Sequence, residues 1–447
     1  MSLRIIHTAD WHIGQTFFGY DRDAEHDAFL NWLVQTLAER QTDVLLIAGD
    51  VFDVANPSAA AQRRFYHFLK EANRRNPGLQ IVVIAGNHDS AVRLEAPNPL
   101  LEELNVTIVG VVRRKEDGTV DFDALRIPLY DRQGRRQAWC LAVPYLRSGD
   151  YPPSEEVPDT YCAGLDRMYK ESTAFAVSLR KPGEALVAMG HLHATGAELS
   201  DDDRSERVIM GGLESVPAAA FPDEIAYTAL GHIHKAQRVG GKETIRYAGS
   251  PLPMSFSEKN YRHQVVEIEL EGADVSQIRS FPVPVLARLM RVPEQPAPPA
   301  EVLEKLAALP DISPVSAIGS ATGSVTGSAA EPVAGSVTGS AAGFAAGEND
   351  PSRWPYVEVR VLLTEPDPGF RRRVEEALEG KAVRLTAIVP SYPQGEAEGE
   401  RGPLSYADLQ KIDPLDMLRH AFAVKYGSEL PQEMEELFQE VIREVSL

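Results

Sequence analysis

Five clusters of polar residues, each placed directly after an apolar run, occupy the first 234 residues of the chain. The runs, LRII, DVLLIA, QIVVIA, EALVAM and YTAL, are typical of buried β-strands. The cluster residues suited to metal binding or catalysis are Asp10 and His12 in TADWH, Asp50 in IAGDVFD, Asn87, His88 and Asp89 in IAGNHD, His191 in AMGHLH, and His232 and His234 in LGHIH. Ligand sites in α/β sheets lie outside the carboxyl ends of the strands, so the five clusters are expected to share one site.

Strand-like and helix-like segments alternate between residue 3 and about residue 110, which is typical of a layered α/β sheet. Residues 24–40 carry apolar side chains at helical spacing on one face, and another long helix is expected near residues 161–179. The closing strand-like runs of this region, at 243–251 and 264–271, follow one another without helices. We therefore expect a second sheet packed on the first.

The composition of the chain changes near residue 284. A proline-rich stretch at 293–299 is interpreted as a joint, and residues 313–347 are almost entirely Gly, Ser, Ala, Thr, Val and Pro. This insert contains GSVTGSAA twice and has too few bulky apolar residues to order itself, so it is expected to be flexible. A strand–helix–strand pattern follows, and then two helices. The expected parts are a main domain at 1–284, a cap domain at 285–400 that holds the insert, and a helical segment at 401–447.

The charge of the chain limits how it can meet nucleic acid. It has 45 basic and 65 acidic residues, a formal charge of −20. This balance argues against a protein that coats nucleic acid by bulk electrostatics, but a nucleic-acid enzyme can rely on local attraction. Three basic patches are candidates for such contacts: residues 113–115, Arg132 with 135–136, and 371–373. Each patch is more often a solvated surface than a phosphate clamp.

The cysteines and the ends of the chain bear on location. Cys140 and Cys162 lie in apolar segments and are expected to be buried, reduced thiols. The sequence has no run of eighteen apolar residues, and its N-terminus lacks the charged and apolar regions of a signal peptide. These features predict a cytoplasmic protein without a membrane span.

The donor types in the five clusters suit a pair of divalent cations. Two cations about 3.5–4 Å apart activate a water and clamp the oxygens of the transition state in phosphodiester hydrolysis. One ligand must bridge the pair, which suits a carboxylate, and neutral donors keep the site positive enough to attract phosphate. Mixed imidazole and carboxylate ligation favours manganese, iron or zinc over calcium.

The motif order D-x-H, G-D, G-N-H-D, G-H and G-H-x-H resembles the calcineurin-like metallophosphoesterases. TADWHIG and the tail from DPLDML onward are similar to the nuclease subunits of bacterial SbcCD-type exonucleases. The resemblance covers residues 1–285 and 401–447. It implies an α/β fold, a layered αββα sandwich with a small α+β cap domain and a C-terminal helical pair. It also implies two ligand sets that share one bridging carboxylate: Asp10, His12, Asp50 and His234, and Asp50, Asn87, His191 and His232.

The same resemblance assigns roles beside the metals. It implies that His88 lies next to the scissile phosphate, where it stabilises charge or protonates the leaving oxygen, and that Asp89 orients its ring. The sequence GHLH leaves His193 as an alternative to His191, which we prefer because it follows the strand directly. The remaining histidines match no motif and are expected to be structural or exposed: His7, His26, His67, His263 and His420.

Three functions remain open: a DNA nuclease subunit, a small-substrate phosphodiesterase or phosphatase, and a non-catalytic scaffold. The complete ligand set disfavours the scaffold, and the region beyond residue 285 favours the nuclease. The resemblance implies two manganese ions, 3′–5′ exonuclease activity on duplex DNA, and endonuclease activity on single strands and hairpins in repair, recombination and replication. It also implies an SMC-like ATPase partner, SbcC, and a homodimer of the nuclease subunit within a heterotetramer.

Overall fold

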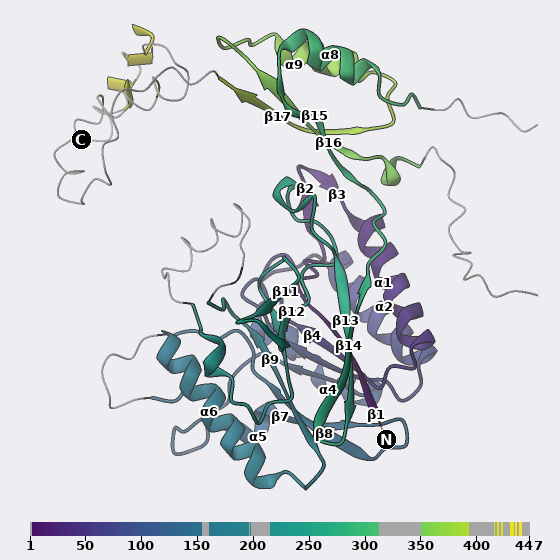
Figure 1. The fold of residues 1–447 in the computed structure, drawn as a ribbon, viewed down its shortest axis with the longest axis vertical. Helices are drawn as coiled ribbons and strands as arrows, with labels where there is room; N and C mark the ends of the chain where they lie inside the picture. The colour runs from purple at the N-terminus through teal and green to yellow at the C-terminus, as the bar shows by residue number, and fades with distance from the viewer. Residues whose placement is uncertain are drawn as a thin grey trace, which may run out of the picture. The chain divides into compact units, whose positions relative to one another are not determined.

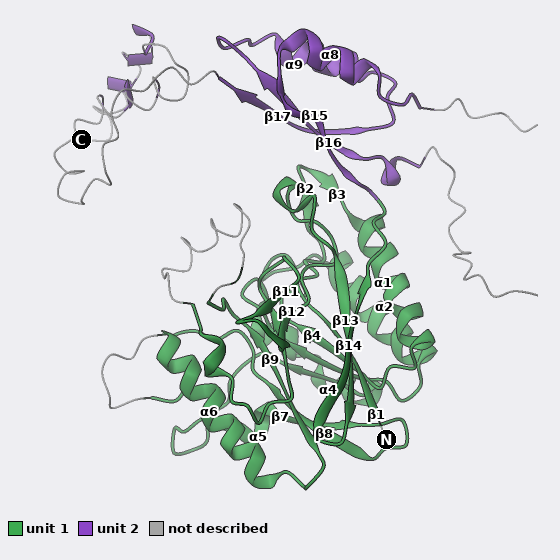
Figure 2. Ribbon diagram, viewed as in Figure 1, with its two compact units in different colours: residues 1–286 green, residues 287–447 purple. Residues whose placement is uncertain are grey.

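The computed structural model describes residues 2–153, 161–195, 197, 215–312 and 350–392, and scattered positions between 415 and 439. The chain forms two compact units, residues 1–286 and 287–447, shown in separate colours in Figure 2. In the described part of the chain, no helix is long and apolar enough to cross a membrane.

Two six-stranded sheets form the centre of the first unit. The first sheet contains, in spatial order, β14 (Asp274–Pro282), β13 (Gln264–Glu271), β1 (Ser2–Thr8), β4 (Val44–Ala48), β5 (Gln80–Ile84) and β6 (Val106–Val109). Neighbours from β1 to β6 are parallel, whereas β13 runs antiparallel to β1. The run at 264–271 therefore joins the sheet in which the chain begins. The expectation that the closing strands build the second sheet is wrong for this strand, because its partner lies more than 250 residues away, from Ser2 opposite Glu271 onward.

The second sheet is built from the middle of the chain. It contains, in spatial order, β11 (Gln237–Val239), β12 (Lys242–Tyr247), β10 (Tyr227–Gly231), β9 (Ala185–His191), β8 (Arg136–Ala142) and β7 (Arg126–Tyr130). The strands β8, β9, β10 and β12 are parallel, and β7 and β11 run antiparallel at the two edges. The predicted second sheet is therefore present, and its parallel strands end on one side of the sheet.

Helices cover the outer faces of the two sheets (Figure 1). The long helices α1 (Asp23–Glu39) and α2 (Ala59–Arg75) lie beside each other over the first sheet, and α6 (Tyr161–Leu179) belongs to the side of the second. Alternate residues of each strand face different layers. Ile5 packs in the core shared by the two sheets, whereas Ile6 packs with Phe29 of α1 and Phe65 of α2. The predicted αββα sandwich is confirmed.

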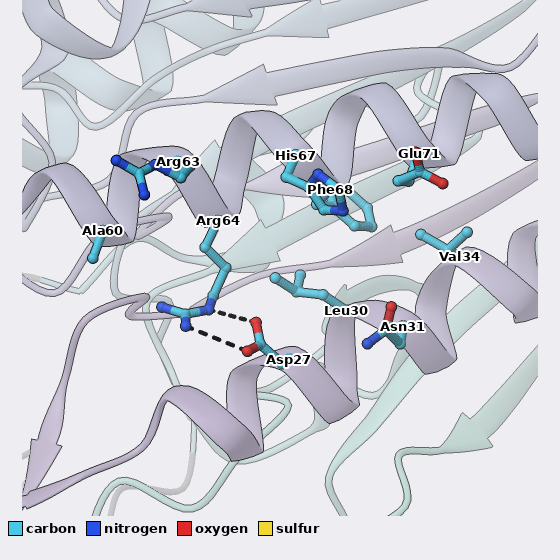
Figure 3. A pocket seen from close by; sticks show the side chains of 10 residues that line it. All are labelled: Asp27, Leu30, Asn31, Val34, Ala60, Arg63, Arg64, His67, Phe68 and Glu71. Carbon is cyan, nitrogen blue, oxygen red and sulfur yellow. Dashed lines mark hydrogen bonds and ion pairs between the residues drawn. The ribbon is translucent and has the colours of Figure 1, made fainter. Parts of the chain in front are cut away.

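Short elements connect these layers. They are the hairpin of β2 (Thr16–Phe17) and β3 (Tyr20–Asp21), the helices α3 (Ala91–Glu95), α4 (Asn98–Leu101) and α5 (Phe122–Leu125), and the 3₁₀ turns η1 (Glu102–Leu104), η2 (Ala218–Ala220) and η3 (Phe256–Glu258). On their outer face, α1 and α2 enclose a groove of about 450 Å³ (Figure 3). Arg64 of α2 crosses this groove to Asp27 of α1, with Nε and Oδ1 2.6 Å apart. None of the seven predicted metal ligands lines it.

The second unit is a small sheet covered by two helices. Its strands β15 (Leu289–Ala297), β16 (Tyr356–Leu362) and β17 (Arg384–Ser391) are parallel, and the helices are α8 (Pro299–Ala307) and α9 (Phe370–Ala377); the 3₁₀ turn η4 (Pro351–Arg353) precedes β16. Val302 and Phe370 of the helices pack on Val357 and Val359 of β16. The predicted strand–helix–strand pattern is present.

The interpretation of residues 293–299 as a joint is wrong. This stretch contains the second half of β15 and the start of α8. Proline is tolerated in an edge strand and at a break in the register, and β15 is an edge strand whose register shifts between Val292 and Ala297. Pro299 lies in the first turn of α8, where its missing N–H costs nothing.

Two predicted features lie mostly outside the described residues. The Gly/Ser/Ala insert, 313–347, is one of them. The helical tail is the other, although described positions within it, such as Leu415, Phe422 and Phe438, are helical. Arg419 forms an ion pair with Glu435, so a described contact joins the two predicted tail helices.

Candidate metal centre

The five predicted clusters meet at the carboxyl ends of five strands, β1, β4, β5, β9 and β10. Backbone hydrogen bonds hold the first two loops together, because Asp10 N donates to Gly49 O and His12 N donates to Asp50 O, at 3.1 and 3.0 Å. The loop after β10 is fixed to the first cluster, because His232 N donates to Asp10 Oδ1 at 2.8 Å. Clusters from both sheets therefore contribute to one site.

One half of the site gathers residues from the loops after β1, β4 and β10. Ligand atoms of Asp10, His12 and Asp50 all lie within 4.8 Å of one another. His12 Nε2 is 3.8 Å from Asp50 Oδ2, and the ring of His234 lies 5.3 Å from the ring of His12. These four residues are the predicted ligands of the first metal.

The other half lies on the opposite side of Asp50. His191 Nε2 is 3.1 Å from Asp50 Oδ2 and 2.9 Å from Asn87 Oδ1. His232 Nδ1 approaches the same amide oxygen of Asn87 at 3.0 Å. Asp50 thus lies between His12 and His191, in the position that a ligand shared by two metals would need.

Acceptor groups fix three of the imidazole rings. Nδ1 of His191 lies 2.9 Å from Ala48 O, Nδ1 of His12 lies 3.2 Å from Asp53 Oδ1, and Nδ1 of His234 lies 2.9 Å from Glu258 Oε1. Because these oxygens only accept, Nδ1 carries the proton in the neutral ring and Nε2 keeps the lone pair. Such outer partners orient histidine ligands in metal sites.

The sequence analysis missed Asp53 and Glu258. Asp53 was in view, since IAGDVFD ends on it, three residues after Asp50. Glu258 carried no such signal, because it lies in η3, 24 residues after His234 and outside every motif. Its side chain is fully buried, and its second oxygen accepts from Met254 N at 2.9 Å.

The backbone of the site is strained. Asp10, His12, Asp50 and His232 have positive φ angles, of 56°, 45°, 49° and 99°. Side chains rarely adopt this conformation, and strain of this kind collects at functional sites, held there by the surrounding structure. Four predicted ligands are therefore aimed by loops whose geometry local preference alone would not select.

Two glycines before the ligands are required by close approach. A Cβ at Gly86 would collide with the carboxylate and the backbone nitrogen of Asp50, and a Cβ at Gly231 would collide with Ala48 O. Glycine therefore precedes Asn87 and His232 because neighbouring loops contact its α-carbon.

The site is buried and rich in charge. Asp10 and Asp50 are 0% and 2% exposed. Burial raises the pKa of Asp10. Burial acts on Asp50 in the same sense, but His191 and His12 hold its pKa well below the usual range. Burial lowers the pKa of His191, whereas Asp50 and Asp10 outweigh this and raise it to about 9. The carboxylates and imidazoles thus compensate one another in the absence of a cation.

The donor set fits divalent metals. Asp10 Oδ2 and His12 Nε2 are buried and lack a hydrogen-bond partner, which is costly for polar atoms unless another ligand satisfies them. Both belong to the cluster with Asp50. Neutral imidazole nitrogens beside carboxylate oxygens suit transition metals. A divalent cation would satisfy both unpaired atoms.

The predicted catalytic pair differs from expectation in its contacts. The half-buried His88 donates its backbone N–H to Asp50 Oδ1 and places Nδ1 2.9 Å from Asp53 O. Asp89 accepts from the backbone N–H groups of Val51, Phe52 and Gly86, at 3.1, 3.0 and 2.9 Å. Asp89 therefore ties the loops after β4 and β5 together, and the described contact that orients the ring of His88 comes from Asp53.

The other histidines lie apart from the ligand set. His193 is half-buried, and its carbonyl accepts from Val216 N at 2.9 Å. His7, His26 and His263 are buried, with ring nitrogens on backbone or hydroxyl oxygens, as in the contact of His26 Nε2 with Trp11 O. His67 is exposed on α2. His420 lies outside the described residues.

The three basic patches are largely matched by acidic neighbours. Ion pairs join Arg113 to Glu95, Arg132 to Asp43, Arg135 to Asp131, Arg136 to Glu184, Arg371 to Glu375, Arg372 to Glu376, and Arg373 to Asp367. Paired arginines attract phosphate less strongly than unpaired ones. The patches that the sequence singled out are thus poor candidates for a nucleic-acid surface. Both cysteines are free thiols, Cys140 buried and Cys162 partly so, as predicted.

The fold and the cluster define a phosphoesterase class. Residues 3–236 match the family model described as calcineurin-like phosphoesterase. Residues 285–426 match a model described as the type 5 capsule protein repressor C-terminal domain.

Relatives narrow this assignment. Over 317 residues the chain is 43% identical to the SbcD subunit of the nuclease SbcCD from Rhodobacter capsulatus, which covers 69% of this chain and 77% of the relative. The protein of the same name from Escherichia coli K12 is 36% identical, covering 63% and 69%, and that from Bacillus subtilis is 33% identical, covering 61% and 67%. The chain therefore belongs to the calcineurin-like phosphoesterases and, within them, to the SbcD nucleases.

Proposed function

We propose that this chain is the DNA-cleaving subunit of an SbcCD-type complex, hydrolysing phosphodiester bonds with two divalent metals. The observation that carries the proposal is the shared position of Asp50, between His12 on one side and His191 on the other. The names of the relatives, nuclease subunits of SbcCD, support DNA as the substrate.

Seven residues would hold the metals. The first set is Asp10, His12, Asp50 and His234, and the second is Asp50, Asn87, His191 and His232. When bound, the two cations supply an activated water and positive charge beside the phosphorus. We propose manganese, because carboxylate, amide and imidazole donors are mixed in the set. Asp53 and Glu258 would keep His12 and His234 in the tautomer that presents Nε2.

His88 is the proposed catalytic side chain. Asp53 O accepts from Nδ1, so Nε2 is the nitrogen that remains to meet a phosphate oxygen. In its protonated form the ring can stabilise charge on that oxygen or donate a proton to the leaving group. Asp89 would act indirectly, by holding the loops that carry Asp50 and Asn87 in register.

The finer features follow the family resemblance. We propose 3′–5′ exonuclease activity on duplex ends, endonuclease activity on single strands and hairpins, and roles in DNA repair, recombination and replication. The proposed partner is the SMC-like ATPase SbcC, bound through residues 401–447, with two nuclease subunits in a heterotetramer. In this proposal residues 1–284 cleave DNA, residues 285–400 form the cap, and the free thiols Cys140 and Cys162 support a reducing, cytoplasmic location.

One comparison of substrates tests the proposal. The full-length chain, with manganese, is given a linear DNA duplex labelled at its ends and, separately, bis(p-nitrophenyl) phosphate. We expect nucleotides to be released from the duplex in a manganese-dependent reaction that Asp50→Asn abolishes. Cleavage of the aryl ester without any cleavage of DNA, alone or with the ATPase, would instead identify a small-substrate phosphodiesterase.

A further inference from the structure

The hairpin of β2 and β3 holds an aromatic residue in an unfavourable conformation. Its two turn residues, Phe18 and Gly19, have φ angles of 50° and 84°. Two-residue hairpin turns with positive φ at both positions favour Asn, Asp or Gly at the first position. A phenylalanine there is strained, because its Cβ crowds the backbone in this region. The turn by itself therefore gives no reason for Phe18.

Phe18 presents its ring to solvent from a rigid base. The residue is 54% exposed, although its ring contacts two buried aromatic rings, those of Phe17 and Phe256, with centroids 5.0 and 5.9 Å away. Phe17 and Phe256 also contact each other, at 5.7 Å. The exposed ring is thus supported from below by two buried ones.

This aromatic base is tied to the metal centre on both sides. On one side, Gln15 N donates to His12 O at 3.0 Å. On the other, Phe256 begins η3, and Glu258 at the end of that turn holds His234. The buried Arg22 joins the two sides, donating to Gln15 Oε1 at 2.8 Å and to Pro253 O at 2.7 Å. Phe18 is therefore mounted on the segments that position two predicted metal ligands.

We propose that Phe18 stacks on a base of the DNA strand that enters the metal centre, so that its ring positions the substrate. This inference rests on the proposed DNA substrate. Stacking suits an enzyme that cuts without regard to sequence, because every base offers a π face to an aromatic ring. A local rule broken at a well-supported position is expected where function requires the residue.

The substitution Phe18→Asn separates stacking from folding. Asn-Gly is the preferred pair for this turn, so the variant is expected to keep or raise the melting temperature. Loss of one stacked base should raise KM for duplex DNA about 10-fold or more, whereas hydrolysis of bis(p-nitrophenyl) phosphate should stay unchanged. Phe18→Trp keeps a stacking ring and should stay close to the original KM.

Fluorescence reports stacking without turnover. The full-length chain is mixed with a duplex that carries 2-aminopurine as its terminal base, with phosphorothioate linkages beside it to slow cleavage. We expect binding to quench the base in the original chain and in the Phe18→Trp variant, and much less in the asparagine variant. Equal KM and equal quenching for Phe18→Asn would overturn the inference while leaving the proposed nuclease intact. A wild-type chain that neither binds nor cuts DNA would overturn both.

Discussion

Glu258 Oε1 lies 2.9 Å from Nδ1 of His234, and both side chains are buried beneath the metal centre. The contact leaves Nε2 of His234 as the ligand nitrogen and places a carboxylate behind it, an arrangement that raises the basicity of the ring. Since Glu258 also accepts from Met254 N, its position is fixed from two directions.

Replacing Glu258 with glutamine should weaken metal binding by about 10- to 100-fold, because an amide orients His234 less firmly and carries no charge. Calorimetric titration of the metal-free protein with manganese measures this. Glu267→Gln is the matched control, since Glu267 is also a buried glutamate in the first unit but pairs with Arg279 instead. Equal losses in the two variants would mean that Glu258 has only a structural role.

His88→Ala should keep both metals and lose about 100- to 1,000-fold in the rate of phosphodiester cleavage, because charge stabilisation in the transition state is removed. Metal content by mass spectrometry and single-turnover cleavage check the two halves of this prediction. Asp50→Ala should behave in the opposite way and lose both metals together. A His88 variant that binds fewer than two metals would place His88 among the ligands.

Acid should destabilise the first unit through His7. Its ring bridges the two sheets, with Nδ1 3.0 Å from Tyr227 Oη and Nε2 3.2 Å from Leu230 O. Burial lowers the pKa of His7 from 6.5 to about 3. Protonation therefore favours the unfolded chain, so this stabilisation is complete above pH 6.5 and is lost as the pH falls from 6.5 towards 3.

The variant His7→Asn tests this. It should lower the free energy of unfolding at pH 7.5 and flatten its dependence on pH, by about 1.4 kcal/mol per pH unit between pH 4 and 5.5. Urea unfolding at several pH values gives these slopes. His67→Asn, on the exposed face of α2, should leave the slope unchanged. An unchanged slope for His7→Asn would show that the ring is not held neutral.

Replacing residues 313–347 with a short Gly/Ser loop should change neither melting temperature nor cleavage rate. The prediction rests on composition, because a Gly/Ser-rich segment with few bulky residues behaves as a flexible chain. Scanning calorimetry and the duplex assay measure the two quantities. A marked drop in either would reveal a folded or binding role for the repeat GSVTGSAA.

Deleting residues 403–447 should abolish assembly with the ATPase and leave manganese-dependent cleavage of single-stranded DNA by the isolated subunit. The predicted second helix of the tail carries one broad apolar stripe, suited to docking in a groove of a partner: Met434, Leu437, Phe438, Val441, Ile442 and Val445. Size-exclusion chromatography of the mixed subunits tests assembly. Full-affinity assembly by the truncated chain would show that the tail only packs within this protein.

The amino-acid sequence by itself determined the chemistry and the layers. Strand ends can be read from apolar runs, and parallel strands bring their carboxyl ends to one edge, so residues as distant as Asp10 and His234 were predicted to meet. Helical spacing located α1 and α6 to within a residue or so. These signals are local, or follow from a general rule of sheets, and need no knowledge of which strands pair.

Only the tertiary structure decided what depends on distant pairing. The antiparallel contact of β13 with β1, the supporting role of Glu258 and the positive φ of Asp10 each arise from contacts between segments far apart in the chain. Proline content suggested a joint where β15 runs, because an edge strand tolerates residues that a central strand does not. Composition and periodicity record which residues are buried, and carry little information on which partner buries them.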